Sequence, residues 1–200
     1  MPRERDIEAF DKRAPGYDRG WLGQLHHDIA ERTARIAAAG APHARHVLDV
    51  GCGTGYLLGQ LAVRLPGAAQ LQGVDPAPAM VECARSRVAD GARVHFQAGM
   101  AEDLPFRDGV FDLVVSTTSF DHWVDQRAGL AECRRVLVRD GCFVLADQFS
   151  PWLVPTLYGS RRGRARTAGR AGALLREVGF RSLEWYSLGL SLVRAVSATA

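Results

Sequence analysis

Three alternating glycines that join an apolar segment to a helical one are the most informative chemical feature of the sequence. Gly51, Gly53 and Gly55 directly follow the apolar run 47–50. Glycine lets a backbone turn sharply and approach a ligand closely, and the first N–H groups of the following helix favour an anionic group. Asp75 ends the next apolar segment, where a carboxylate can accept hydrogen bonds from ribose hydroxyls. These features predict a ligand that contains a nucleoside.

The glycine spacing narrows the kind of nucleoside ligand. A dinucleotide-binding loop has the pattern G-x-G-x-x-G, but the sixth position counted from Gly51 is Tyr56. The observed pattern is G-x-G-x-G, with Asp49 two residues before it. This pattern resembles the first motif of the class I S-adenosylmethionine-dependent methyltransferases.

The resemblance extends over about residues 10–148. Its later motifs resemble the ubiquinone/menaquinone-biosynthesis-like subgroup, also called methyltransferase type 11. Five motifs in the expected order make the resemblance specific. Besides the glycine loop, the matching segments are 10–18, 74–80, 101–106 with 111–116, and 134–137 with 140–143.

The resemblance implies roles around S-adenosylmethionine. The backbone at Gly51 and Gly53 approaches the methionine part, Asp49 lies near the ammonium group, and Asp75 accepts from both ribose hydroxyls. The other implied contacts are Pro76 and Met80 on the faces of adenine, Ala101 and Glu102 at its edge, Tyr17 at the methionine carboxylate and Ser116 under the methyl group.

One position departs from the subgroup. The residue before the Ala101–Glu102 pair is usually an Asp that accepts from the adenine amino group, but here it is Met100. Methionine offers no comparable acceptor. Glu102, Asp103 or water would then take over this contact.

His122 is the candidate catalytic base. Methyl transfer from a sulfonium needs the nucleophile, methyl carbon and sulfur in line, and positioning supplies up to ~7–11 kcal/mol. A hydroxyl or carbon nucleophile would also lose a proton. His122 follows the predicted strand 111–116, and loops at that end of a strand face the crevice. The alternative is that His122 and Trp123 pack under the N-terminal helices as part of the pocket wall.

Other candidate residues favour ordinary roles. Cys52 in the glycine loop is more typical of a small space-filler than of a reactive thiol. His26 and His27 belong to a predicted helix, and solvent exposure is favoured over substrate contact for both. The basic stretch 161–170 is favoured as a solvated loop over an anion site.

Apolar segments of strand length alternate with helical segments, which predicts a parallel sheet covered by helices. A turn at Gly189 predicts a final hairpin and hence an antiparallel strand. With the resemblance, we expect an α/β fold with a Rossmann-like seven-stranded sheet, mostly parallel. Helices are predicted over 6–39 with a break at 14–16, and over 56–64, 78–89, 127–137 and 167–178; strands are predicted over 47–50, up to 75, 94–96, 111–116, 142–146, 182–188 and 191–196.

Length and composition favour one methyltransferase domain. The chain has 200 residues, 47% hydrophobic and 24% charged, which is an ordinary globular composition. The predicted division is an N-terminal helical cover (1–40), a cofactor-binding core (45–148), a short lid or loop (149–166) and a last helix with a hairpin (167–200).

Charge and cysteine usage exclude several classes of protein. The net charge of +3 is too small for the footprint of a nucleic-acid binder. The four cysteines form no CxxC pair and lie near no histidine at metal-ligand spacing, which predicts no metal and a reducing compartment. The charged N-terminus and the lack of a run of about 18 apolar residues predict a cytoplasmic protein without a membrane span.

The predicted function is methyl transfer from S-adenosylmethionine to a small apolar or aromatic acceptor, at oxygen, nitrogen or carbon. The main alternative is a non-catalytic protein or partner subunit that binds S-adenosylmethionine or S-adenosylhomocysteine. A nicotinamide-dependent oxidoreductase conflicts with the glycine spacing. A base-modifying enzyme conflicts with the missing Asn/Asp/Ser-Pro-Pro-Tyr/Phe tetrapeptide. The acceptor and the oligomeric state stay open.

Overall fold

The computed structural model describes residues 2–88, 93–149, 167–189 and 193–200. Its strands are β1 (His46–Val50), β2 (Gln70–Asp75), β3 (Val94–Ala98), β4 (Phe111–Thr117), β5 (Leu137–Gln148), β6 (Arg181–Ser187) and β7 (Val193–Thr199). Its helices are α1 (Pro2–Arg13), α2 (Gly20–Gly40), α3 (Tyr56–Arg64), α4 (Pro78–Arg85), α5 (Gln126–Val136) and α6 (Ala168–Glu177), with short 3-10 helices η1 (Ala14–Gly16) and η2 (Phe120–His122).

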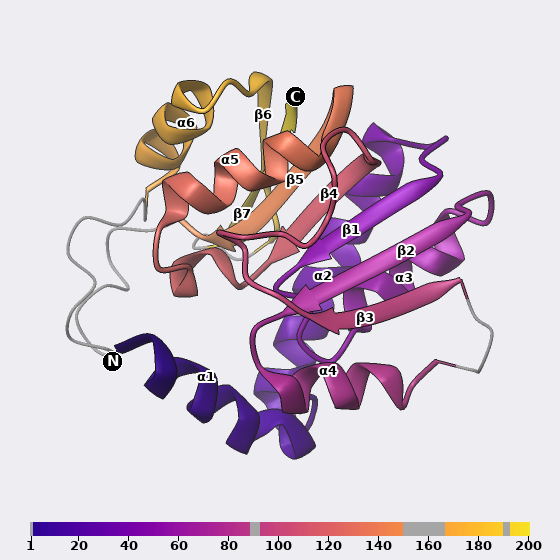
Figure 1. The fold of residues 1–200 in the computed structure, drawn as a ribbon, viewed down its shortest axis with the longest axis vertical. Coiled ribbons are helices and arrows are strands. Elements are labelled where there is room, and N and C mark those ends of the chain that lie inside the picture. Colours follow the sequence, from indigo (N-terminus) through magenta and orange to yellow (C-terminus); the bar gives the residue numbers. More distant parts are fainter. Residues whose placement is uncertain (1, 89–92, 150–166, 190–192) are drawn as a thin grey trace.

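All seven strands form one sheet in the order β3-β2-β1-β4-β5-β7-β6 (Figure 1). Strands β1 to β5 run parallel to one another, and β7 is antiparallel to both β5 and β6. The predicted mostly parallel sheet with an antiparallel final hairpin is therefore confirmed. The chain order reverses between β1 and β4, which opens a crevice at the carboxyl ends of these strands.

Both faces of the sheet are buried, so neighbouring residues of one strand enter different cores. Val47 packs with Ala34 and other residues of α2 and α3, whereas Leu48 packs with Leu130 and other residues of α5 and α6. Figure 1 shows these two pairs of helices on opposite sides of the sheet. Burial on both faces explains why the strands read as continuous apolar runs.

Two predicted boundaries were wrong. The helix predicted to end at residue 89 ends at Arg85. The strand predicted to begin at Cys142 already begins at Leu137, because an irregularity lets its pairing with β4 continue on both sides of Asp140. Asp140 has a φ of 61° and sits in this irregularity rather than in a turn between a helix and a strand.

The N-terminal helices cover the carboxyl end of the sheet. The Ala14-Pro15-Gly16 break forms η1, and Ala14 packs on Met80 of α4. The Asp11 carboxylate of α1 accepts a 2.8 Å hydrogen bond from the Ala79 N–H at the start of α4, where no side chain of the N-cap residue does so. Figure 1 shows α1 beside the ends of β2 and β3 that carry the arrowheads.

Two sequence predictions fall largely outside the described residues. The predicted lid lies there except for Phe149, which is buried. The basic stretch lies there except for its last members from 167 on, where Arg170 is exposed on α6. The division into cover, core, lid and last segment stays a prediction.

Candidate functional site

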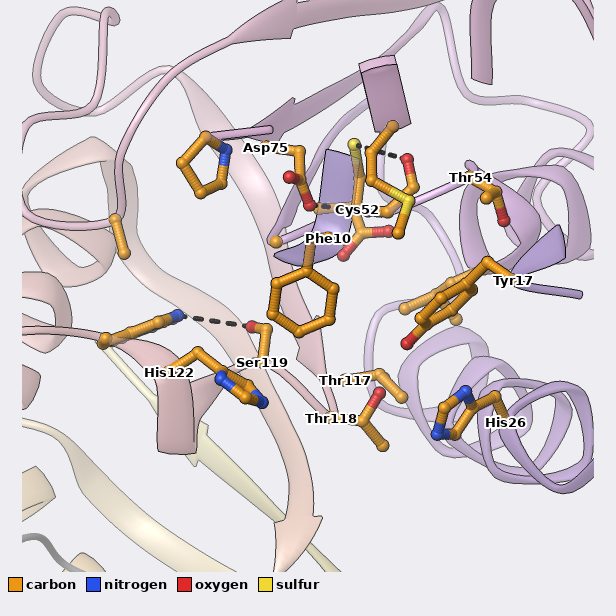
Figure 2. A pocket seen from close by; sticks show the side chains of 18 of the residues that line it. Phe10, Tyr17, His26, Cys52, Thr54, Asp75, Thr117, Thr118, Ser119 and His122 are labelled. Carbon is orange, nitrogen blue, oxygen red and sulfur yellow. Dashed lines mark hydrogen bonds between the residues drawn. The ribbon is translucent and has the colours of Figure 1, made fainter. Parts of the chain in front are cut away.

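A cavity of about 1110 Å³, counted with its open mouth, lies at the crevice. One wall is formed by the glycine loop with the ends of β1 and β2, and the other by α1, the turn after η1 and α2. The loop that follows β4 and carries η2 forms the floor between them. Figure 2 shows side chains from all three regions directed into this space.

The glycine loop is fixed by backbone contacts. The N–H groups of Gly51 and Cys52 both donate to the Val74 carbonyl, at 2.8 and 3.0 Å. Gly51 has a φ of 77°, and a Cβ there would lie 2.4 Å from the side chain of Ser119, so only glycine fits. At Gly53, with a φ of 51°, a Cβ would meet nothing within 4 Å. The loop therefore presents bare backbone to the open cavity.

Asp75 is anchored to the loop through both of its carboxylate oxygens. One accepts from the Gly53 N–H and the other from the Ala77 N–H, each at 2.9 Å. Asp75 is 9% exposed, and this burial raises its pKa to about 6 against the opposing effect of the two N–H donors. A carboxylate oxygen has a second lone pair. Asp75 can therefore still accept from a pair of neighbouring hydroxyl groups.

Asp49 is a buried acid without a partner. It is 1% exposed, and neither of its oxygens has a hydrogen-bond partner among the described residues. Burial, assisted by the nearby charge of Asp75, raises its pKa well above the ordinary value. A buried carboxyl group without compensation is costly. This position therefore suits a cationic group of a ligand.

The predicted adenine contacts all lie on the cavity. Pro76, Met80, Ala101 and Glu102 line it, together with Met100. One oxygen of Glu102 accepts from two backbone N–H groups of the loop before α5, at 2.6 and 3.1 Å. Glu102 therefore anchors the loop before α5 with one carboxylate oxygen. Its other oxygen stays available for a contact with adenine.

Aromatic rings from the N-terminal helices form the opposite wall. Phe10 packs edge-on against His122, with ring centroids 4.9 Å apart at 87°, and lies 6.4 Å from the ring of Tyr17. Burial, together with the charge of Asp75, raises the pKa of Tyr17 to about 12. The tyrosine is thus a neutral hydroxyl group at every physiological pH.

Asp18 joins the two walls. Its carboxylate accepts from His27 at 2.8 Å, from the Thr54 hydroxyl of the glycine loop at 3.1 Å, and from Arg87 beyond α4. Burial raises the pKa of Asp18, but these hydrogen bonds outweigh it and leave the pKa below the ordinary value. His27 also stacks on Tyr56, with ring centroids 3.7 Å apart. The sequence favoured solvent for His27, and this network corrects that interpretation.

His26 also faces the cavity instead of solvent, which the sequence did not predict. Its ring stacks on Tyr17 at 5.1 Å, and its Nδ1 atom is buried without a hydrogen-bond partner. A spacing signal was present, because His26 lies three and four residues before the buried Ile29 and Ala30 of the same helix. That pattern assigns His26 to the inner face of α2.

Ser116 does not line the cavity, in contrast to the prediction. It is fully buried, and its hydroxyl group lies 2.8 Å from that of Ser119. The prediction took the last residue of the strand as the exposed one, but the strand continues through Thr117. Thr117, Thr118 and Ser119 line the cavity instead.

Comparison with known proteins agrees with this geometry. A family described as a methyltransferase domain matches residues 47–141. The malonyl-[acyl-carrier protein] O-methyltransferase of Geobacter sulfurreducens is 35% identical over 92% of this chain and 73% of its own length. The chain belongs to the class I S-adenosylmethionine-dependent methyltransferases.

A second relative supports this assignment for the methyltransferase, and a solved structure shares its fold. A ubiquinone/menaquinone biosynthesis C-methyltransferase of Citrifermentans bemidjiense is 34% identical, over 75% of this chain and 66% of that protein. Among solved structures, a chain of the complex between the Haloferax volcanii Trm112 methyltransferase activator and a putative methyltransferase superposes with a TM-score of 0.79 at 21% identity, covering 96% and 97% of the two chains. The latter likeness concerns the fold.

The residues of this methyltransferase fit S-adenosylmethionine, the methyl donor of the family. Asp49 lacks the positive partner that an α-ammonium group would supply. Asp75 keeps acceptor capacity for two ribose hydroxyls. Gly53 leaves room for close approach of the methionine part. The fit therefore rests on an unpaired acid, an anchored acid and a side-chain-free stretch of backbone.

The described parts of the methyltransferase contain neither a helix suited to cross a membrane nor a cluster of metal-binding side chains. No helix there is both long enough and apolar enough to cross a membrane. No group of three or more His, Cys, Asp or Glu side chains there is arranged to hold a metal ion.

Proposed function

We propose that the chain transfers a methyl group from S-adenosylmethionine to a small acceptor with an apolar or aromatic body. The observation that carries this proposal is the polarity of the cavity. At the strand end lie two buried acids, Asp49 and Asp75, and at the helical end the rings of Phe10 and His122 meet edge-on. A charged cofactor suits the first end and an apolar acceptor suits the second.

The roles of the cofactor-side residues follow from their contacts. S-adenosylmethionine supplies an electrophilic methyl group on a positively charged sulfur. Asp75 holds the ribose, and Asp49 balances the ammonium group, directly or through water. The backbone at Gly51 and Gly53 borders the methionine part, whose carboxylate meets the hydroxyl group of Tyr17. Pro76 and Met80 enclose adenine, with Ala101 and Glu102 at its edge.

On the acceptor side the main contribution of the protein is orientation. The rings of Phe10 and His122 meet edge-on, and Thr117 and Thr118 line the same cavity. Confining an acceptor there restricts its direction of approach, and such positioning can supply about 7–11 kcal/mol toward the barrier of a displacement. We assign His122 to contact with the acceptor.

The names of the relatives leave the size and class of the acceptor open. One of them is described as acting on malonyl-[acyl-carrier protein] and another in ubiquinone/menaquinone biosynthesis. Their names describe acceptors that differ greatly in charge and size. The acceptor class has to come from the lining of the cavity.

Isothermal titration calorimetry with S-adenosylmethionine and S-adenosylhomocysteine tests the cofactor side. Loss of two hydrogen bonds to the Asp75 carboxylate would cost about 2–5 kcal/mol, so Asp75→Ala should weaken binding by roughly 30- to 4000-fold. Asp28→Ala, an exposed position on α2, is the matched control and should bind like the wild type. Equal affinity of Asp75→Ala and wild type would contradict the assignment of the ribose to Asp75.

The methyltransferase reaction itself is tested by acceptor screening. Wild-type protein that binds both ligands is incubated with S-adenosylmethionine and a panel of small aromatic compounds, and S-adenosylhomocysteine is quantified. Formation of S-adenosylhomocysteine that depends on the acceptor supports the proposal. Binding of the cofactor without turnover on any small acceptor would contradict it.

A further inference from the structure

We propose that His26 accepts the proton of a neutral, hydroxyl-bearing acceptor, a phenol or an enol, as the methyl group is transferred. This inference rests on the proposed function, because it concerns the acceptor end of the same cavity. It selects oxygen from the acceptor atoms that the sequence left open.

The position of His26 is the first part of the argument. The imidazole lies on the inner face of α2 and stacks on Tyr17, with ring centroids 5.1 Å apart and an angle of 24° between the rings. Figure 2 shows it directed toward Thr117 and Thr118 at the end of β4. Tyr17 lies between His26 and the glycine loop, so the imidazole borders the acceptor end and not the cofactor end.

Two polar atoms of this corner have no protein partner. Nδ1 of His26 and Oγ1 of Thr117 are both buried without a hydrogen bond among the described residues. Buried polar atoms are normally paired. Two unpaired polar atoms on residues that line one cavity therefore leave hydrogen-bonding capacity for a bound polar group.

Thr118, beside Thr117 in the cavity lining, has an unusual backbone conformation that the protein holds in place. Its φ is 52°, a conformation that residues other than glycine rarely adopt. Its N–H donates to the Ala146 carbonyl of β5 at 2.8 Å, which holds this conformation. The chain therefore turns sharply at Thr118, where its side chain joins the lining opposite His26.

The charges of the lining favour a neutral acceptor. The described residues that line the cavity include no Lys or Arg, so nothing there pairs with a carboxylate or phosphate of an acceptor. The acid nearest to His26 is occupied, because Asp18 already accepts from His27, Thr54 and Arg87. A hydroxyl group satisfies the unpaired atoms without adding charge.

The imidazole is in the right protonation state to accept a proton. Burial and the neighbouring His27 lower the pKa of His26, and Asp18 only partly opposes them. The other titratable or charged groups at the corner are Tyr17, which stays neutral, Arg13, whose charge acts on Tyr17, and His122, which faces the same cavity from η2. His26 therefore favours its neutral form near pH 7, and its unpaired Nδ1 is the nitrogen that a hydroxyl group of the acceptor would meet.

The proposed step balances in atoms and charge. The acceptor oxygen forms a bond to the methyl carbon, and the carbon–sulfur bond breaks with its electron pair remaining on sulfur. The hydroxyl proton moves to Nδ1 of His26, the nitrogen that has no partner in the protein. The positive charge lost by the sulfonium thus appears on the imidazolium, which releases its proton to solvent after the product leaves.

The first test measures binding in the presence of saturating S-adenosylhomocysteine. Three probes share one ring system: 2-naphthol, its methyl ether 2-methoxynaphthalene, and 2-naphthoate. The wild type should bind 2-naphthol about 5- to 10-fold more tightly than the ether, as one additional hydrogen bond predicts, and should bind naphthoate most weakly. His26→Phe should abolish the preference for naphthol, while His95→Phe, at an exposed site on β3, should retain it.

The second test separates His26 from His122 by kinetics with 2-naphthol. His26→Gln should lower kcat by about 10²- to 10⁴-fold, the usual contribution of a positioned base, and should remove the fall in kcat at low pH. His122→Gln should mainly raise KM and should retain that fall. Circular dichroism shows whether each variant is folded, and the pH profile of the wild type does not depend on any variant.

The outcomes distinguish the two proposals. If S-adenosylhomocysteine does not bind, the proposed function fails before this inference is tested. If it binds but naphthoate binds more tightly than naphthol, or wild-type protein does not methylate naphthol, the inference is overturned. It is also overturned if His122→Gln, and not His26→Gln, removes the low-pH fall.

Discussion

The two walls of the cavity are held in place by different means. The glycine-loop wall, residues 49–55 with Asp75, is fixed by backbone hydrogen bonds to Val74 and by carboxylate contacts to Gly53 and Ala77. The helical wall, comprising Phe10, Tyr17 and His26, is fixed by ring stacking and by side-chain hydrogen bonds such as those of Asp18.

This difference predicts which wall of the cavity keeps one shape and which wall can change its shape. A wall of backbone and one anchored carboxylate accepts only one ligand shape, as the shared cofactor requires. A wall of stacked rings can change its shape with a few side chains. We therefore expect single substitutions to damage the first wall severely and the second by degrees.

Gly51→Ala gives the largest expected effect and tests the rigidity of the glycine-loop wall. The left-handed backbone costs a non-glycine residue about 1–2 kcal/mol, and overlap with Ser119 adds about 1–3 kcal/mol. Urea unfolding should show a loss of about 2–5 kcal/mol. Gly67→Ala, where a Cβ meets nothing within 4 Å, is the control and should change stability little. A similar small loss for both variants would show that the loop can relax.

Asp75→Asn tests the strain stored in the same wall. The folded-state pKa of Asp75 is raised from 3.8 to about 6, so the stabilising effect of its proton is present at low pH and is lost as the pH rises through 6. In the ligand-free wild type, ionisation of Asp75 should lower the free energy of unfolding by about 2–3 kcal/mol between acidic and neutral pH. Urea unfolding across this range should show less of this decline in Asp75→Asn. An unchanged pH profile would argue against a perturbed Asp75.

Asp147→Asn provides the matched comparison outside the cavity. Asp147 is 5% exposed, and burial raises its pKa to about 6 as well. Its replacement should reduce the pH dependence in the same direction. Because Asp147 does not line the cavity, the affinity for the cofactor should stay unchanged.

Asp18→Ala tests the junction between the walls, with an intermediate effect. Loss of the bonds to His27 and Thr54 should lower the free energy of unfolding by about 1–2 kcal/mol at neutral pH. Because the pKa of Asp18 is lowered, this contribution is present above its ordinary pKa and is lost as the pH falls through the folded value. Trypsin should then cleave faster after Arg13 and Arg19. The same cleavage rate in Asp18→Ala and Asp28→Ala would exclude a junction role.

Tyr17→Phe gives the smallest expected effect and tests whether the helical wall responds by degrees. It removes one hydroxyl group and keeps the ring that stacks on His26. Calorimetry should show a loss in cofactor affinity of about 1 kcal/mol, roughly fivefold, with little change in stability. Tyr186→Phe on β6 is the control and should bind normally. A loss as large as that of Asp75→Ala would mean that the helical wall is as strictly required as the loop.

The sequence predicted the glycine-loop wall better than the helical wall. Local sequence spacing determines the turn at Gly51, the end of the strand at Asp75 and the sheet around them. Some of the residues there, such as Gly51, fit only one backbone conformation. The predicted fold is confirmed, and all the predicted cofactor contacts except Ser116 lie on the cavity. Ser116 failed because a strand end cannot be located to one residue from apolarity alone.

The helical wall could not be predicted because its contacts are long-range. Nothing local shows that Asp18 meets Arg87, or that His26 lies on Tyr17 and not in solvent. The spacing of buried residues along α2 assigned His26 to the inner face of the helix but did not show what that face contacts. Stacking between segments becomes visible only when the helices are placed on the sheet.

The span of the contacts made by the N-terminal helices also determines when the cavity forms. Asp11 meets Ala79 and Asp18 meets Arg87 across 68 and 69 intervening steps of the chain. Closing loops of that length costs entropy before any contact offsets it, so such contacts form late in folding. The helices α1 and α2 are thus expected to dock after the sheet has formed. A ligand that touches both walls would complete the folding of the chain as well as take part in its chemistry.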